Sequence, residues 1–194
     1  MVIQVLPGVK ALIFDCDGTL ADTMPIHIKA WCDTFADYGI RCPEEFLQTV
    51  MGMPAAKIIE RFNRLYGHHL DPVAFAVEKN RRAGRKLHRT QPIEPVADIV
   101  RQYMGRLPMA VASGGTRKNV LLTLASVGLA DCFAAVLTSD DDVRPKPNPE
   151  IFLEAARRMN VAPGACQVFE DGEAGFEAAR RAGMFVTDVR GFID

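Results

Sequence analysis

The 194-residue sequence has no apolar run near the roughly 18 residues that a membrane-spanning helix requires. Its first ten residues, MVIQVLPGVK, lack the basic start, apolar stretch and small-residue cleavage site of a signal peptide. It also lacks an excess of either charge, because 23 basic and 24 acidic side chains leave a formal net charge of -1. We therefore expect a cytoplasmic protein with no membrane or nucleic-acid partner, in which any anion-binding site is local.

The cysteines show none of the spacings that mark a metal site or a disulfide framework. Their number is odd, and no C-x-x-C pair occurs among Cys16, Cys32, Cys42, Cys132 and Cys166. This pattern favours reduced thiols. Cys16 lies between two aspartates, which disfavour its thiolate, so we interpret it as a buried strand residue and not as a nucleophile.

Short apolar runs that end in polar or glycine-rich turns predict the strands of a parallel sheet. The expected strands are residues 11–14, 109–112, 133–137, 167–169 and 185–189. From residue 108 onward, amphipathic helical patterns at residues 117–126, 149–159 and 174–182 separate them. This alternation predicts an α/β fold with a doubly wound parallel sheet that is covered by helices on both faces.

The segment after the first strand has a different character. Helical patterns occupy residues 26–38, 43–50, 55–66 and 72–87, with no convincing strand among them. We predict an α/β core domain formed by residues 1–20 and 91–194, interrupted by an all-helical cap domain at residues 21–90.

Polar residues follow the predicted strands at the edge where parallel sheets bind ligands. Asp15 and Asp17 come after the first strand, Ser113 after the second, and Glu170 and Asp171 after the fourth. Their convergence would crowd several carboxylates together, which is costly unless a cation is present. Oxygen ligands of this kind suit Mg²⁺.

Two features of the sequence suit a phosphoryl group at the same edge. Lys146, between two prolines, supplies a positive charge, and Ser113 supplies a hydroxyl group, although Ser113 is also a suitable helix cap. Gly114 and Gly115 form a tight strand-to-helix turn that presents backbone N–H groups to an anion. We therefore expect a small phosphorylated molecule as the ligand.

Four segments together carry a family resemblance. Phe14-Asp-Cys-Asp-Gly-Thr-Leu-Ala-Asp-Thr23 resembles the first motif of the haloacid dehalogenase superfamily, and Ala112-Ser-Gly-Gly115 resembles the second. Arg144-Pro-Lys-Pro-Asn-Pro149 is similar to the third motif and Phe169-Glu-Asp-Gly-Glu-Ala-Gly175 to the fourth. The motifs occur in order and span nearly the whole chain. The helical insert is similar to the caps of the β-phosphoglucomutase-like subgroup.

The resemblance implies a magnesium-dependent phosphatase that acts on a sugar phosphate such as fructose 1-phosphate or 6-phosphogluconate. Asp15 attacks phosphorus and forms an aspartyl-phosphate, while Asp17 protonates the leaving oxygen and then activates water. The metal ligands are Asp171, the Asp15 carboxylate and the Asp17 main-chain carbonyl, and Glu170 orients the metal's waters. Two residues stabilise charge on the transferred phosphoryl group: Ser113 and Lys146.

The cap must set substrate specificity, since the core motifs handle only phosphate and metal. In the subgroup's pattern His27 faces the site, where it contacts substrate or assists proton transfer, but a purely structural histidine fits the sequence almost equally well. Gly52 begins the stretch that matches the substrate-binding cap loop, and Thr23 matches the hinge. Trp31 fits the cap core better than a sugar-stacking role.

The cap loop departs from the mutase pattern. β-Phosphoglucomutases place a Lys and an Arg there to hold a second phosphate, whereas this chain has Met51, Pro54 and Ala55. Arg117 remains a candidate for binding anionic substrate groups. Six further basic residues of the cap are expected on solvated helix faces, although one of them could reach a substrate carboxylate or hydroxyl group: Lys57, Arg61, Arg81, Arg82, Arg85 and Lys86. We favour a phosphatase over the alternative, a sugar phosphate mutase.

Two other classes fit less well. A metal-independent dehalogenase does not need Asp17, which this chain keeps together with the two acids of the fourth motif. A non-catalytic binding protein on the same scaffold should have lost at least one catalytic group, and none is lost. Nothing in the sequence indicates an obligate interface, so we expect a monomer.

Overall fold

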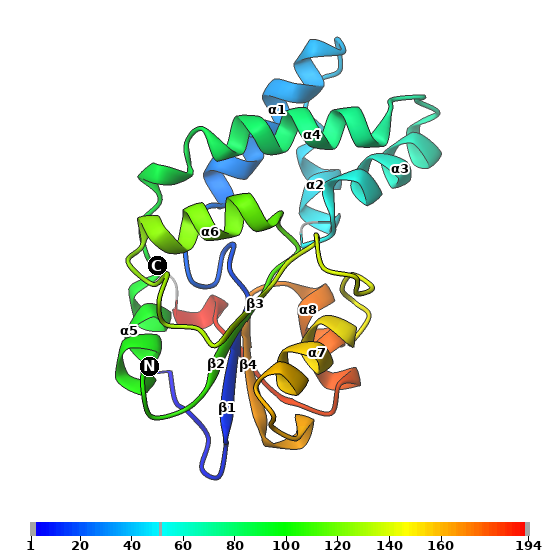
Figure 1. The fold of residues 1–194 in the computed structure, drawn as a ribbon. Coiled ribbons are helices and arrows are strands. Elements are labelled where there is room, and N and C mark those ends of the chain that lie inside the picture. Colours follow the sequence, from blue (N-terminus) through cyan, green and yellow to red (C-terminus); the bar gives the residue numbers. More distant parts are fainter. Residues whose placement is uncertain (1–2, 51, 193–194) are drawn as a thin grey trace.

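The computed structural model describes residues 3–50 and 52–192, which form a parallel sheet beneath a group of helices (Figure 1). Met51 lies outside the described residues. The strand order is β3-β2-β1-β4-β5. The strands are β1 (Ala11–Phe14), β2 (Met109–Ala112), β3 (Ala135–Leu137), β4 (Cys166–Glu170) and β5 (Phe185–Asp188). The predicted doubly wound α/β fold is confirmed.

Helices cover both faces of the sheet (Figure 1). Apolar residues of α5 (Glu94–Tyr103) and α6 (Arg117–Ser126) pack with Phe14 on one face, and those of α7 (Glu150–Arg158) and α8 (Glu173–Arg181) pack with Ile13 on the other. Phe14 also stacks on Phe169 of the neighbouring strand, with ring centroids 4.8 Å apart. Burial on both faces explains why the strands are continuous apolar runs.

Most predicted helices and strands agree with the structure to within two residues at each end. The largest shift is in α4, which ends at Gly84 and is followed by a 3₁₀ turn at Leu87–Arg89. The helix α5 was not predicted, although Val96, Ile99 and Val100 have helical spacing and are buried. Two more 3₁₀ turns lie at Pro163–Ala165 and Arg190–Phe192. Among the described residues, no helix is long and apolar enough to cross a membrane.

The inserted helices have a hydrophobic core of their own, apart from the two cores of the sheet. They are α1 (Met24–Asp37), α2 (Glu44–Val50), α3 (Ala55–Tyr66) and α4 (Pro72–Gly84). Phe35 lies at the centre, with its ring 4.9 Å from that of Phe62 and 4.8 Å from that of Phe75. Aromatic burial of this kind can stabilise a small helical unit, since truncating a buried Phe costs about 3–5 kcal/mol.

The chain enters and leaves the helical unit through two adjacent segments. Ala21 forms a β-bridge with Pro92, and the Asp22 N–H donates to the Gln91 carbonyl over 3.0 Å. The predicted domain division at residues 20/21 and 90/91 falls at this double connection and stays a prediction.

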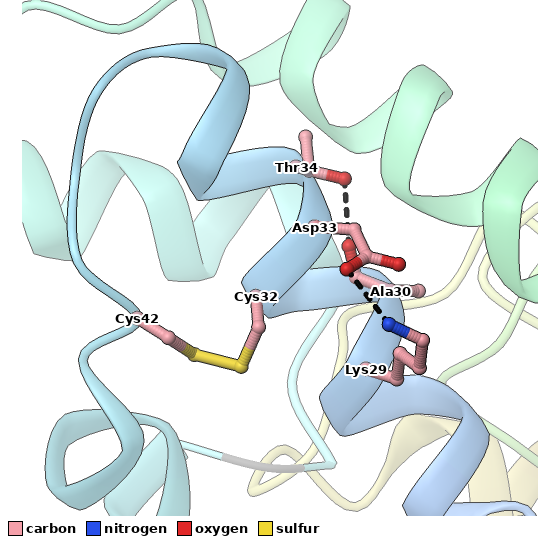
Figure 2. Close-up of a disulfide and its surroundings, with 6 residues drawn as sticks. All are labelled: Lys29, Ala30, Cys32, Asp33, Thr34 and Cys42. Carbon is pink, nitrogen blue, oxygen red and sulfur yellow. Dashed lines mark hydrogen bonds and ion pairs between the residues drawn. A yellow bond between two sulfur atoms is a disulfide. The ribbon is translucent and has the colours of Figure 1, made fainter.

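The expectation of five reduced thiols is wrong for one pair. Cys32 on α1 and Cys42 just before α2 form a disulfide (Figure 2). Gly39, with φ of 68°, turns the chain back so that Cys42 returns alongside the helix. The two cysteines are ten residues apart, which is not a spacing that marks a disulfide, so the pair becomes evident only from the path of the loop in the folded chain. Cys16, Cys132 and Cys166 are free thiols.

Candidate active site

Three acidic side chains meet where β1 and β4 end. The Asp15 N–H donates to the Phe169 carbonyl over 3.0 Å and so extends the pairing of the two strands. This places Asp15 beside Glu170 and Asp171, with one carboxylate oxygen of each within 4.8 Å of the others. The convergence predicted for these residues therefore follows from the strand register.

Lys146 reaches this cluster from the loop before α7. Its Nζ lies 2.6 Å from Asp15 Oδ1 and 2.6 Å from Glu170 Oε1, and it also lies over the Phe152 ring. Burial by itself would lower the pKa of Lys146, but the two carboxylates outweigh it and raise that pKa above its usual value. The ammonium group is therefore a permanent positive charge beside Asp15.

The acidic cluster keeps an unbalanced negative charge. Burial raises the pKa of Asp15 well above its usual range, against the opposing effect of Lys146, and burial together with Glu170 raises the pKa of Asp171 to about 6. One ammonium group faces three carboxylates, so two negative charges remain when all are ionised. A divalent cation with a preference for oxygen ligands fits this donor set.

Glu170 is already fully engaged by the protein. One of its carboxylate oxygens accepts from Lys146, and the other accepts from the N–H groups of Asp171 and Gly172 at 2.7 and 2.9 Å. A Cβ at Gly175 would overlap the Glu170 side chain, so the fourth motif needs glycine there. Glu170 therefore orients Lys146 and the turn that carries Asp171.

Asp17 lies in a separate polar network. Its Oδ1 accepts from the Thr23 hydroxyl at 2.7 Å and lies 3.1 Å from His27 Nε2, while His27 Nδ1 lies 3.0 Å from Lys79 Nζ. Burial would raise the pKa of Asp17, but its contacts with His27, Thr23 and Lys79 together lower it to about 2. Burial and then Lys79 lower the pKa of His27, and burial lowers that of Lys79 to about 8.

These shifts define the proton positions in the network. Protonated Lys79 donates to His27 Nδ1, so the neutral imidazole carries its hydrogen on Nε2 and donates to Asp17. Thr23 and His27 thus both donate a hydrogen bond to the ionised Asp17 carboxylate. Asp17 is therefore ionised in this arrangement and must take up a proton before it can act as an acid.

Lys79 was not among the residues predicted for the site. It lies on α4 between Phe75 and Ala83, four residues from each, and all three side chains are buried. Its Nζ also lies 5.2 Å from the centroid of the Trp31 ring. A lysine within an apolar stripe at helical spacing was the available signal, because such a residue is rarely buried without a polar partner.

Ser113 lies in the turn after β2 and is fully buried. Its Oγ accepts from the Gly115 N–H at 3.0 Å, whereas Thr116 occupies the cap position of α6 without a side-chain hydrogen bond. Ser113 therefore stabilises the glycine turn and does not cap the helix.

A cavity of about 720 Å³ lies between the sheet and the helical unit. Nine of the predicted site residues line it: Asp15, Asp17, His27, Gly52, Ser113, Gly114, Lys146, Glu170 and Asp171. Trp31 also lines it while packing against Phe35 and Phe75 in the cap core. The predicted residues, which lie up to 156 positions apart in the sequence, thus share one pocket.

The structure places Arg117 elsewhere. Its Nη2 donates to Asp141 at 2.7 Å and to the Val136 carbonyl at 3.2 Å, and the residue is not among those lining the cavity. Asp141 also accepts from the Thr138 N–H and from Arg158, so its carboxylate holds this loop and Arg117 in place. The position of Arg117 does not support a substrate contact.

Of the six basic cap residues named from the sequence, Arg61 alone lines the cavity. It lies on α3 one turn after Ile58, which also faces the cavity. Within residues 3–50 and 52–192, the Arg61 guanidinium forms no ion pair or hydrogen bond. It is therefore available to a bound molecule.

Comparison with known proteins agrees with this geometry. Residues 12–189 match the haloacid dehalogenase-like hydrolase family. The fructose-1-phosphate phosphatase YqaB of Escherichia coli (strain K12) is 40% identical over 92% of this chain and 95% of that protein. The beta-phosphoglucomutase of Bacillus subtilis (strain 168) is 26% identical over 93% of this chain and 83% of that protein.

Among solved structures, CbbY from Rhodobacter sphaeroides in complex with phosphate superimposes with a TM-score of 0.81. It is 25% identical and covers 92% of this chain and 84% of its own. The parallel sheet and the acid cluster at its carboxyl edge define a hydrolase scaffold, and this chain belongs to the haloacid dehalogenase-like hydrolase family. The resemblance of the four motifs is thereby confirmed.

Proposed function

We propose that the protein is a Mg²⁺-dependent phosphatase of small sugar phosphates. The observation that carries this proposal is the buried Asp15 carboxylate, held beside Lys146 and two further acids at the floor of the cavity. The 40% identity to a fructose-1-phosphate phosphatase supports a sugar phosphate as substrate. Fructose 1-phosphate is therefore the first compound to test, followed by 6-phosphogluconate.

The reaction divides into two steps at Asp15. A carboxylate oxygen of Asp15 forms a bond to phosphorus while the bond from phosphorus to the sugar oxygen breaks, and Asp17, which must first take up a proton, gives that proton to the sugar oxygen. Water then attacks phosphorus, Asp17 takes a proton from it, and the bond to Asp15 breaks. His27 and Thr23 hold the Asp17 side chain toward the cavity throughout both steps.

The metal would be held by the carboxylates of Asp15 and Asp171 and the main-chain carbonyl of Asp17. When bound, it supplies positive charge that binds phosphate oxygens and neutralises charge in the transition state. Lys146 and the glycine turn after Ser113 would contact the remaining phosphoryl oxygens. Glu170 keeps Lys146 directed at them through the 2.6 Å contact.

Hydrolysis is favoured over phosphoryl transfer between two positions of a sugar. A mutase must retain a bisphosphate, and that needs cationic groups for the second phosphate. Pro54 and Ala55 occupy the cap loop, and Arg117 is paired with Asp141. Arg61 is then the cap cation available to substrate hydroxyl or acidic groups.

A phosphate-release assay tests the proposal. Purified protein, stripped of metal and resupplied with Mg²⁺, should release phosphate from fructose 1-phosphate and from p-nitrophenyl phosphate, and excess EDTA should abolish release. Full turnover under chelation would contradict the metal site. Formation of glucose 6-phosphate from β-glucose 1-phosphate, measured by a coupled dehydrogenase, at a rate exceeding phosphate release would favour the mutase.

Lys79 gives a prediction for the pH dependence. Its pKa of about 8 means that it loses its proton as pH rises through 8, which removes the donor that fixes the His27 tautomer. We expect kcat to fall on the alkaline side with an apparent pKa near 8. Lys79→Met should remove that alkaline limb and lower kcat by less than the about 10²–10⁴-fold that a positioned acid–base group contributes, because Lys79 acts on Asp17 only through His27.

The stability of the Lys79 variant should change in the opposite direction. The folded-state pKa of Lys79 is lower than that of an unfolded lysine, so its protonated form destabilises the fold below pH 8. At pH 7 Lys79→Met should therefore unfold at the same temperature as the wild type or a higher one. The control is Lys86→Met, at an exposed position. An unchanged pH profile for Lys79→Met would contradict the assigned role.

A further inference from the structure

The cap loop touches the core at a residue that has no side chain. Gly114 lies in the turn after β2, and Gly52 lies in the loop between α2 and α3. A Cβ built on Gly114 would lie 2.6 Å from the Gly52 carbonyl oxygen and 3.5 Å from its carbon. Atoms this close do not occur in proteins, so the loop can approach only because residue 114 is glycine.

Within residues 3–50 and 52–192, the same Cβ would meet no other part of the protein. Apart from its chain neighbours, the two Gly52 atoms are the only ones within 4 Å among the described residues. The φ angle of Gly114 is not in the left-handed region, so alanine can adopt the same backbone conformation. The core therefore has room for a methyl group at residue 114. The helical unit in its present position would clash with that methyl group at Gly52.

This contact lies at the rim of the cavity, adjacent to the reacting groups. Ser113 and Gly114 line the cavity from the core, and Thr49, Gly52 and Met53 line it from the helical unit. The connections at residues 21–22 and 91–92 join the two units elsewhere, and a hydrogen bond from Asn119 of α6 to the Asn80 carbonyl of α4 adds a further contact. The Gly52 contact is thus where the cap loop meets the phosphate-binding turn.

We propose that the cap loop rests against Gly114 when the cap closes over a sugar phosphate. The absence of a side chain at residue 114 then determines how closely the cap can approach the core. This inference rests on the proposed phosphatase function. The closed position brings Arg61 and the Asp17 network over the same substrate and excludes water from the phosphoryl group. Gly114 is accordingly a positioning residue that acts through the cap.

The test is Gly114→Ala, with Gly164→Ala as the matched control. Gly164 lies in the 3₁₀ turn at Pro163–Ala165 with an ordinary φ angle, and a Cβ there would have its nearest contact at 3.9 Å. In Gly114→Ala we expect KM for fructose 1-phosphate to rise and kcat to fall, with a combined loss of about tenfold to a hundredfold, since a misplacement of 1 Å can cost that much.

A readout independent of catalysis is Trp31, the single tryptophan of the chain. It is 1% exposed and lines the cavity from α1, so a cap held open should increase its quenching by acrylamide. Increased quenching in Gly114→Ala with an unchanged unfolding temperature supports the proposal. Quenching and sugar-phosphate kinetics equal to those of Gly164→Ala would overturn it.

Two further outcomes are distinguishable. If the wild type hydrolyses no phosphate ester, the proposed function fails, but the comparison of Trp31 quenching still decides whether residue 114 controls closure. If Gly114→Ala does not fold, hydrogen exchange of the wild type with and without inorganic phosphate replaces it. Joint protection of residues 48–53 and 113–116 is then expected, and exchange unchanged in both segments would overturn the proposal.

Discussion

Replacing Asp15 by asparagine should abolish phosphate release from every ester that the protein hydrolyses. The amide keeps the shape of the side chain but cannot form the bond to phosphorus, and loss of a nucleophile costs about 10⁴-fold or more in kcat. The measurement is phosphate release under saturating fructose 1-phosphate and Mg²⁺. Asp98→Asn, an exposed carboxylate on α5, is the matched control and should retain full activity.

The Asp15→Asn variant should lose activity without losing stability. Burial raises the folded-state pKa of Asp15 above its unfolded value, so its ionised form opposes folding at neutral pH. The unfolding temperature at pH 7 should therefore equal or exceed that of the wild type. Substantial turnover by this variant would contradict the nucleophile assignment. Loss of activity accompanied by unfolding would instead assign Asp15 a structural role.

Replacing Asp17 by asparagine should have an effect that depends on the leaving group. A sugar oxygen leaves poorly without a proton, so release of the sugar from fructose 1-phosphate should slow about 10²–10⁴-fold. p-Nitrophenolate is a stable leaving group and needs no proton, so its release should continue in the first turnover. Because Asp17 is also proposed to activate water in the second step, the phosphorylated protein should accumulate.

Stopped-flow absorbance checks this prediction. With p-nitrophenyl phosphate, Asp17→Asn should release about one equivalent of p-nitrophenol in a burst, followed by a slow steady rate. The Asp98→Asn control should show the steady rate of the wild type. Equal losses on the two esters with no burst would mean that Asp17 acts before the chemical step, for example by supporting the metal site through its backbone.

The sequence was sufficient for the sheet and for the floor of the cavity. Strands buried on both faces are continuous apolar runs, so Leu12 and Val111 indicated a parallel sheet without any knowledge of tertiary contacts. The carboxyl ends of parallel strands lie at one edge of the sheet, and this rule was enough to predict that Asp15 and Asp171 lie close together. These inferences depend on local pattern and topology, which a sequence carries directly.

The missed features depend on contacts between distant elements. Lys79 reaches His27 because α4 packs against α1, and the sequence spacing of 52 residues does not specify that packing. The pairing of Arg117 was missed because its partner Asp141 lies 24 residues away on a loop whose path was not predictable. The Cys32–Cys42 pair likewise depends on a loop, and the Gly114–Gly52 contact depends on how the cap sits on the core.

The central claim is that Asp15 carries the phosphoryl group during turnover. Rapid acid quench of the protein with p-nitrophenyl phosphate and Mg²⁺, followed by borohydride reduction and peptide mass mapping, tests it directly. An acyl phosphate at Asp15 would be reduced to the side chain of homoserine, and the account predicts this change at Asp15, absent when EDTA is present. Turnover with no such modification, or with the modification at another carboxylate, would contradict it.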